Sequence, residues 1–224
     1  MKRVFYLLSI FLLISCGNSK NSPEFIEAAE GRYLFNSDET LDVHFVDGKM
    51  NVKWRGQDMV PIKAGDNSFY LKEMNEKLIF VSEPEMHIEL APKREHDGEK
   101  FSFLKLAKGE KTPNEYFRNK EYEKALQGYL AIQKRDSLDR TIREWSMNQL
   151  GYHYMRENKM EDAKAIFKIN IALYPKSSNT YDSMGDAYRK EKDTVKAIEY
   201  YKKALAINPE NRSSKRQLQK LTKE

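Results

Sequence analysis

A pattern of small, aromatic and proline residues occurs twice in this chain at a constant offset of 34 residues, and it constrains the fold more than any other feature. The first copy places Leu150, Gly151, Tyr154, Ala163, Phe167 and Pro175, and the second places Met184, Gly185, Tyr188, Ala197, Tyr201 and Pro209. Glycine and alanine allow two helices to approach closely, and an aromatic ring fills the space beside the crossing. The pattern therefore predicts paired helices that stack into a repeat domain.

A period of this length with this spacing resembles the tetratricopeptide repeat, a helix-turn-helix unit. The resemblance implies complete repeats at 144–177 and 178–211. Because two repeats bury little surface alone, we expect a degenerate copy at 109–143 and a capping helix at 212–223. Residues 109–224 are therefore predicted to form one helical-repeat domain.

One position departs from the repeat pattern, because Asn170 stands where the second repeat has Ala204. A buried amide needs a hydrogen-bond partner, so we expect Asn170 to bond to a neighbouring loop. Pro175 ends the preceding helix because proline lacks a backbone N–H. Ser178 or Asn179 is expected to cap the helix that follows.

The N-terminal stretch at 1–15 has the pattern of a secretory signal peptide, in which two positive charges precede an apolar run too short to span a bilayer. The sequence Leu-Ile-Ser-Cys at 13–16 resembles the lipobox of bacterial lipoproteins. This resemblance implies that Cys16 is lipidated and begins the mature chain, with a polar tether at 16–24. Gly17 in place of aspartate implies the outer membrane, in either leaflet. The alternative is a cysteine that follows a signal peptide by chance.

Between residues 25 and 108 the apolar period changes to 2, which is typical of strands. Asp47-Gly48 between two alternating runs predicts a β-hairpin. The alternating runs are 41–46, 50–54, 68–72, 77–81, 87–90 and 101–106. They predict one antiparallel sheet of about six to eight strands, with one face toward a core and one toward water. The fold class is therefore α+β, a small antiparallel β-sheet domain at 25–108 followed by the all-α repeat domain.

The order of several short segments resembles a second family. Residues 30–33, 68–70 and 78–80 are similar to the β domain that follows the catalytic domain in bacterial penicillin-binding-protein-like (beta-lactamase-related) serine hydrolases. In some of those enzymes helical repeats follow, with stretches similar to 167–175 and 179–188. This resemblance covers nearly all of the chain after the signal peptide. It does not include the catalytic domain of those enzymes.

Fragments of the hydrolase signature occur, but in the wrong order. Ser102-Phe-Leu-Lys105 fits the nucleophile motif, Tyr181-Asp-Ser the second motif and His96-Asp-Gly the third. Ser102 and Lys105 lie in a strand pattern, where residues three apart point to opposite faces, so they do not share a proton. We interpret the fragments as coincidence. The four histidines have no zinc-type spacing and no glycine-rich loop occurs, so we expect no enzyme, no cofactor and no metal.

The formal charge of +5 is unevenly distributed. Residues 16–110 carry 13 basic and 18 acidic side chains, whereas residues 111–224 carry 24 basic and 16 acidic ones. A basic half favours anionic lipid, an acidic polymer or an acidic protein, since an exported chain meets no nucleic acid. The alternative is a solvated surface, because lysine and arginine are interspersed with glutamate throughout the repeats.

In the repeat family, ligands lie along the face formed by the first helices of each pair. Matching those positions selects Asn148, Tyr152, Met155 and Arg156 in one repeat and Asp182, Asp186, Arg189 and Lys190 in the next. Mixed charge beside tyrosine and methionine favours a peptide ligand. The basic clamp that some relatives use for a C-terminal carboxylate is absent, because Asp182 and Asp186 at these positions would repel such a carboxylate. Alternatively, Tyr152 and Met155 pack between repeats.

Together these features predict a lipid-anchored, non-catalytic adaptor of the cell envelope that binds another protein or peptide through its repeats. A second hypothesis is an accessory subunit that acts in trans on a separate serine hydrolase or on cell-wall material. In a third, the β domain encloses a small apolar ligand.

Overall fold

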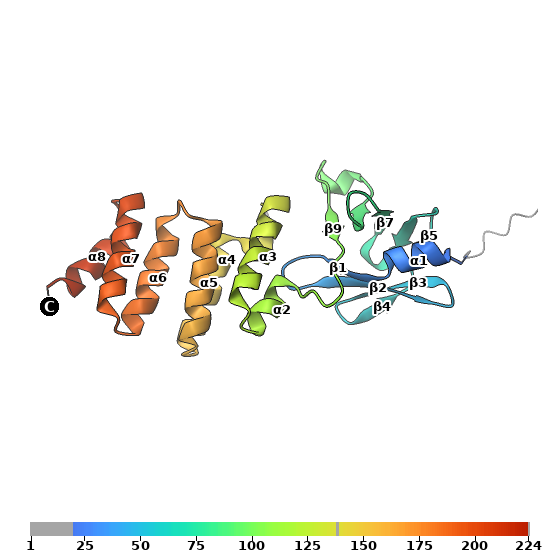
Figure 1. The fold of residues 1–224 in the computed structure, drawn as a ribbon. Helices are drawn as coiled ribbons and strands as arrows, with labels where there is room; N and C mark the ends of the chain where they lie inside the picture. The colour runs from blue at the N-terminus through green and yellow to red at the C-terminus, as the bar shows by residue number, and fades with distance from the viewer. Residues whose placement is uncertain (1–19, 138, 224) are drawn as a thin grey trace, which may run out of the picture. The chain divides into compact units, whose positions relative to one another are not determined.

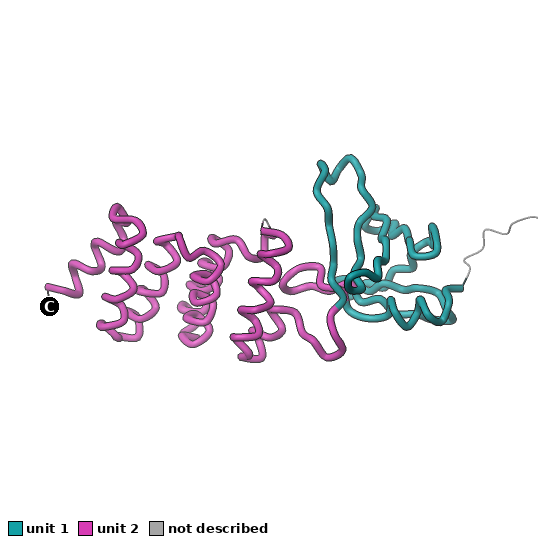
Figure 2. The backbone as a smooth tube through the Cα atoms, turned by 45° about the horizontal axis from the view of Figure 1, so that its top comes forward, with its two compact units in different colours: residues 1–32, 42–105 teal, residues 33–41, 106–224 magenta. Residues whose placement is uncertain are grey.

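The computed structural model describes residues 20–137 and 139–223. The predicted signal peptide at 1–15 and the predicted lipidation site, Cys16, lie outside these ranges. The chain divides into two compact units (Figure 2). The β unit comprises residues up to Arg32 together with Asp42–Lys105, and the helical unit comprises Tyr33–Leu41 and Leu106 onward.

The described residues contain nine strands in two antiparallel sheets (Figure 1). The first sheet has the order β1-β2-β3-β4 and contains β1 (Gly31–Leu34), β2 (Thr40–Val46), β3 (Lys49–Trp54) and β4 (Gln57–Met59). The second has the order β5-β6-β7-β8-β9 and contains β5 (Ile62–Lys63), β6 (Ser68–Leu71), β7 (Glu76–Val81), β8 (His87–Leu90) and β9 (Ser102–Leu104). The prediction of a single sheet was wrong. Pro61, which has no backbone N–H to donate, lies in the break between β4 and β5.

The predicted hairpin is confirmed, because β2 pairs with β3 up to Val46 and Lys49. Asp47 and Gly48 both have positive φ, 53° and 77°, as a tight two-residue hairpin turn requires. Asn21 bonds to the carbonyl oxygen of Gly48 through its backbone N–H (2.9 Å) and its side-chain Nδ2 (3.1 Å). The predicted tether to residue 24 therefore ends before Asn21, which is already held against the β unit.

Four phenylalanines form an aromatic cluster in the β unit, in which Phe69 and Phe80 are buried and Phe25 and Phe45 are partly buried. Phe25, from helix α1 (Pro23–Ala29), lies 5.7 Å from the ring centre of Phe69, 5.5 Å from that of Phe80 and 6.2 Å from that of Phe45. A recess beside Met50 and Phe69 has a volume of about 10 Å³, which is at the limit of what one water molecule needs. This packing lends no support to a small apolar ligand inside the β unit.

The helical unit consists of stacked helices that follow one another along the chain (Figure 1). They are α2 (Pro113–Arg118), α3 (Tyr122–Arg135), α4 (Glu144–Arg156), α5 (Met160–Leu173), α6 (Ser178–Lys190), α7 (Thr194–Ile207) and α8 (Arg212–Leu221). Two 3-10 turns lie in the β unit and one in the helical unit, at Lys72–Met74, Arg94–His96 and Arg140–Ile142. The predicted α+β class is confirmed. No helix in the described ranges has both the length and the apolar character to cross a membrane.

The repeat signature is explained by close helix packing within each pair. An added Cβ at Gly151 would lie 2.3 Å from Cε1 of Phe167, and one at Gly185 would lie 2.7 Å from Cε1 of Tyr201. The signature residues that are fully buried are Ala163, Phe167, Ala197 and Tyr201. Small residues are therefore required where the aromatic ring of the second helix lies against the first helix.

The N-terminal end of the helical unit is completed by a segment that lies between β1 and β2 in the sequence. Helix α2 is short, and its N-terminus carries a capping box formed by Thr112 and Glu115. The backbone N–H of Asn114 donates to the carbonyl oxygen of Ser37 at 2.9 Å. Leu34 is 8% exposed and belongs to the hydrophobic core of the helical unit. Sequence periodicity placed residues 33–41 in the β domain, because it carries no information on such distant contacts.

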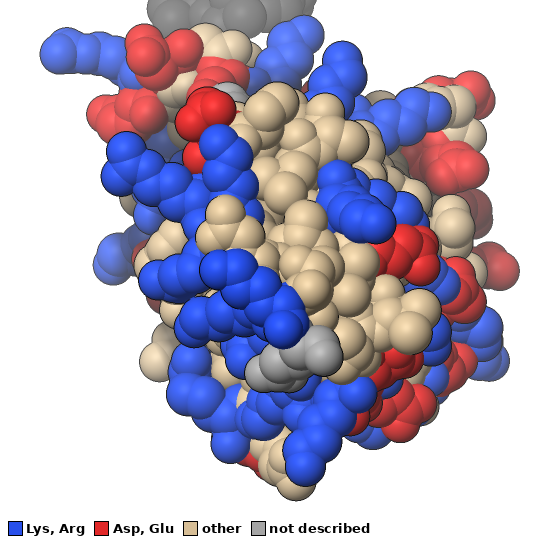
Figure 3. Space-filling model, turned by 90° about the vertical axis from the view of Figure 1, so that its left-hand side faces the viewer, with Lys and Arg blue, Asp and Glu red and all other residues tan. Residues whose placement is uncertain are grey.

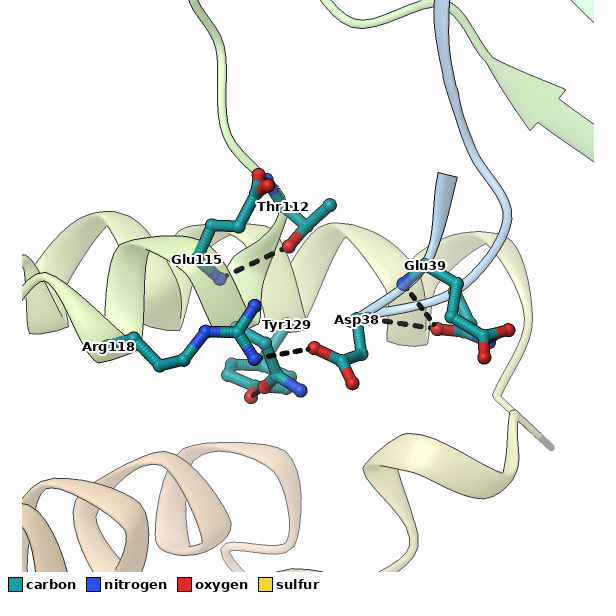
Figure 4. Close-up of polar contacts among 8 residues, drawn as sticks. Asp38, Glu39, Thr112, Glu115, Arg118 and Tyr129 are labelled. Atoms are coloured by element: carbon teal, nitrogen blue, oxygen red, sulfur yellow. Dashed lines mark hydrogen bonds and ion pairs between the residues drawn. The ribbon is translucent and has the colours of Figure 1, made fainter. Parts of the chain in front are cut away.

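An ion pair also joins this segment to the truncated first repeat (Figure 4). Nη1 of Arg118 lies 2.9 Å from a carboxylate oxygen of Asp38. Asp38 is itself held in a turn, since its N–H donates to Oδ1 of Asn36 at 2.9 Å. Tyr129 from α3 donates its hydroxyl to Asn114. The segment thus contributes both apolar and polar contacts where the first helix of the repeat, α2, has only six residues.

Asn170 has a hydrogen-bond partner, as predicted, but the partner belongs to a helix and not to a loop. This fully buried amide donates through Nδ2 to the backbone carbonyl of Glu144, at the start of α4, at 3.1 Å. The predicted cap of α6 was wrong. Ser177 occupies the capping position without a side-chain cap, because the carboxylate of Glu144 accepts from Ser177 Oγ (2.9 Å) and from Asn179 Nδ2 (3.0 Å).

Candidate peptide-binding face

The first helix of each pair presents one face, and on α4 this face carries an exposed tryptophan. Trp145, Asn148, Tyr152 and Arg156 follow a spacing that places them on one side of the helix. Trp145 is 72% exposed, whereas Asn148 is 9% exposed. The sequence analysis missed Trp145. Its position three residues before Asn148 was the available signal.

A hydrogen-bonded network lies beneath this face and connects α4, α6 and α7. The hydroxyl of Tyr152 donates to Oδ2 of Asp186 at 2.9 Å, and the hydroxyl of Tyr201 donates to Oδ1 at 2.7 Å. Arg189 Nη2 lies 3.3 Å from Oδ1 of the same carboxylate. Burial raises the pKa of both tyrosines, so each remains a neutral donor at physiological pH. The network orders the face before any ligand binds.

Asp182 forms a second buried contact, toward α8. Its side chain accepts a hydrogen bond from Ser214 Oγ at 2.5 Å, and the residue is 5% exposed. Burial raises the pKa of this carboxyl group, and the nearby charge of Asp186 adds to the rise, while the hydrogen bond from Ser214 opposes it. Asp182 therefore attaches α8 to α6 and does not face solvent.

The predicted site residues divide into outward-facing and inward-facing groups. Arg156, Arg189 and Lys190 are exposed. Met155 is 7% exposed and belongs to a core cluster with Phe167, and Tyr152 contacts the same ring edge-to-face at 5.4 Å. The structure therefore places Tyr152 and Met155 in contacts between helices, as the alternative interpretation describes, and leaves Trp145 with the basic side chains at the surface.

Comparison with known families identifies the repeat. The model of the tetratricopeptide repeat matches residues 183–211. Within the helical unit, residues 183–211 therefore match one tetratricopeptide repeat. A known relative is the tetratricopeptide repeat domain-containing protein PYG7, chloroplastic, of Arabidopsis thaliana, which is 33% identical over 82 residues. The match covers 37% of this chain and 27% of the relative, so the chain spans about a quarter of that protein's length.

Solved tetratricopeptide structures are similar to the helical unit at low identity. The first repeat domain of human RPAP3 is 21% identical, with a TM-score of 0.35, covering 50% of this chain and 84% of that chain. The Sgt2 repeat domain from Aspergillus fumigatus is also 21% identical, with a TM-score of 0.35, covering 59% of this chain and 80% of that chain.

Residues from the three hydrolase-like sequence fragments form hydrogen bonds with other parts of the structure. The amine of Lys105 donates to the carbonyl oxygen of Ala28 at 2.6 Å, and His96 Nε2 lies 3.2 Å from Oε1 of Glu76. Ser183, in the helical unit, donates to a backbone carbonyl of its own helix at 3.0 Å. Across residues 20–137 and 139–223, no group of three or more acidic, histidine or cysteine side chains is arranged to hold a metal ion.

A hollow of about 340 Å³ lies on a different part of the helical unit, against helices α3, α5, α6 and α7. Tyrosines 122, 188 and 200 contribute to its lining. Lysines at its rim are already paired, since Lys164 lies 2.7 Å from Glu191 and Lys168 contacts Glu123. This hollow offers apolar contacts without a net charge to select a ligand.

The buried carboxyl of Asp182 predicts a pH-dependent stability component. The folded protein holds the carboxyl proton of Asp182 up to a higher pH than the unfolded chain does. The resulting contribution to the free energy of unfolding is fully present below about pH 3.8 and is lost as pH rises through the raised pKa of the folded state. We expect Asp182→Asn to remove it, so that the stability of the variant relative to wild type increases between about pH 4 and 7. Urea unfolding at several pH values measures this difference, with Asp66→Asn, in an exposed loop, as the control. A difference that stays constant over this range contradicts the prediction.

Proposed function

We propose that this chain is a lipid-anchored protein of the bacterial cell envelope that binds another protein or peptide along the first-helix face of its tetratricopeptide repeats, without catalysis. The observation that carries the binding proposal is Trp145, a large aromatic side chain that is 72% exposed on that face. Tryptophan and arginine dominate the binding energy of protein interfaces, and Arg156 lies on the same side of α4.

The hydrogen-bonded network that joins α4, α6 and α7 supports the same conclusion. Tyr152, Asp186 and Tyr201 hold three helices in one arrangement, so binding a partner does not require the helices to be ordered first. A rigid face with one exposed aromatic anchor and a basic neighbour suits a peptide that inserts an apolar side chain and presents an acidic one.

The proposed lipid anchor and the proposed cellular location are inferred from the sequence alone. The lipobox-like residues at 13–16 supply Cys16 as the acceptor of lipid, and Gly17 after it favours the outer membrane. Several acyl chains on one residue hold a protein to a membrane stably. The partner is therefore a protein or peptide that reaches the same envelope compartment.

The binding proposal is tested by cross-linking in intact cells, followed by quantification of the captured partner. We expect Trp145→Ala with Arg156→Ala to reduce the captured partner at least about tenfold, because both hot-spot side chains are removed. The matched control is Val195→Ala with Lys202→Ala, which removes an exposed apolar and an exposed basic side chain from second helix α7. Equal capture by wild type and the Trp145 variant, or equal loss in the control, argues against this face.

A further inference from the structure

We infer that helix α8 extends the first-helix face with a basic stripe, formed by Arg212, Arg216 and Lys220, that binds an extended acidic segment of the partner protein. This inference rests on the proposed function, because it names the chemistry of the partner at the same face. It assigns a ligand-binding role to a helix that the sequence analysis treated only as a cap.

The position of α8 continues the face of α6. Arg216 and Lys220 follow Asp182 and Asp186 by one repeat length of 34 residues, and Ser214 fixes α8 to α6 through Asp182. The three side chains of the basic stripe are exposed. Figure 3 views the side on which α8 lies, and lysine and arginine side chains gather there. The stripe is therefore part of a rigid surface.

The charge of Arg212 does not serve the stability of α8 itself, whereas Lys220 lies in the last turn, where the helix dipole favours a positive charge. Arg212 lies in the first turn, where the helix dipole disfavours a positive charge, and that turn contains no acidic residue. The helix is held by other contacts. Asn211 caps its N-terminus by accepting from the N–H of Ser214 at 3.1 Å, and Ser214 also donates to Asp182.

The two aspartates that precede Arg216 and Lys220 by one repeat length are largely withdrawn from the surface. Asp182 is buried, and the carboxylate of Asp186 accepts hydrogen bonds from two tyrosines. Within the described part of the chain, the ion pair recorded for α8 joins Lys215 to Glu210, and none is recorded for the basic stripe. The two aspartates were predicted to repel a C-terminal carboxylate at this face. Because they face inward, the outward charge of this end is basic.

The shape of the basic stripe favours a polypeptide over a bilayer. Its members are four residues apart, about 6 Å along the helix, which matches the roughly 6.6 Å between alternate residues of an extended chain. Leu218 and Leu221 are half-buried, and none of the exposed large apolar residues in the described ranges lies on α8. A helix that binds a membrane surface needs such an apolar face.

A second copy of this chain does not fit as the occupant by continued stacking. Gln219 stands at the repeat position of Gly151 and Gly185, where an added Cβ already meets an aromatic ring of the following helix. A further second helix therefore cannot approach α8 in the manner of the preceding repeats. An acidic segment lying along the basic stripe needs no such approach.

Fluorescence anisotropy with the purified full chain tests this inference. The probe is a labelled peptide of about 12 residues in which glutamate alternates with threonine, with an amidated C-terminus so that no terminal carboxylate contributes. We expect binding in low salt that weakens as salt increases. Arg216→Glu with Lys220→Glu is expected to weaken it at least tenfold, while Lys108→Glu with Lys134→Glu, the same charge change at exposed positions elsewhere, alters it less than about twofold.

Three results overturn the inference: no peptide binding by wild type, equal affinity after reversal of Arg216 and Lys220, or equal loss in both double variants. Far-ultraviolet circular dichroism confirms that each variant remains folded. Vesicles containing anionic lipid are titrated in parallel, and reversal that abolishes vesicle binding but not peptide binding assigns the stripe to a membrane instead. If cells still show Trp145-dependent capture while the peptide fails to bind, the proposed function stands and only this inference fails.

Discussion

Replacing Leu34 with alanine is expected to lower the free energy of unfolding of the helical unit by about 3 kcal/mol, although residue 34 lies in a strand far from the repeats in sequence. Leu34 is 8% exposed and packs in the same core cluster as Phe117, Tyr129 and Ile132. Truncation removes apolar contacts and leaves a cavity, because the surrounding helices are held by their own hydrogen bonds and close it only partly. Thermal unfolding followed at 222 nm, where helices dominate the signal, measures the effect.

The control for this experiment is Leu104→Ala in β9, where the leucine is 40% exposed. Its truncation is expected to change stability by less than about 0.5 kcal/mol, since little buried surface is lost. An unchanged helical transition in the Leu34 variant would show that the segment 33–41 is not part of the core of the helical unit.

Replacing Gly151 with alanine is expected to lower the stability of the helical unit by about 2 kcal/mol, the balance of two opposing effects. Alanine favours a helix over glycine by about 1 kcal/mol. The added Cβ, however, would lie 2.3 Å from Cε1 and 2.7 Å from Cδ1 of Phe167, so the aromatic ring or the helix must move at a cost of about 3 kcal/mol. Urea unfolding measured by circular dichroism gives the difference.

A double variant separates this steric cause from a general sensitivity of α4. Because leucine is smaller than phenylalanine, Phe167→Leu makes room for the new methyl group. The combined variant is therefore expected to be at least about 1 kcal/mol more stable than the sum of the single effects predicts. Gln149→Ala, at an exposed position of the same helix, is the control for helix propensity. Additive single effects would contradict a direct clash between Gly151 and Phe167.

The repeats themselves were predictable from local spacing. Gly151 and Phe167 belong to one helix pair, so the requirement for a small residue opposite an aromatic ring appears within one repeat length of sequence. The hairpin at Asp47-Gly48 was predictable for the same reason, since its turn geometry depends on two adjacent residues. Pro61 carried a signal for the break between the two sheets that the period-2 pattern concealed.

The binding face was predictable only in part. Repeat spacing placed Tyr152, Asp182 and Asp186 on the first helices, but it did not show that their polar groups bond to one another and to neighbouring helices. Trp145 was not predicted, although it is 72% exposed on α4. Burial depends on which helices cover a side chain, and spacing along one helix does not determine that.

The sequence by itself determined that this chain has short strands followed by paired helices with a 34-residue period, because those features depend on residues close together in the chain. Only the tertiary structure decided that Leu34 completes the helical core, that Asp182 and Asp186 face inward, and that α8 presents Arg216 and Lys220 outward. The physical reason is that burial and pairing between distant segments are set by the packing of whole elements, which local periodicity does not specify.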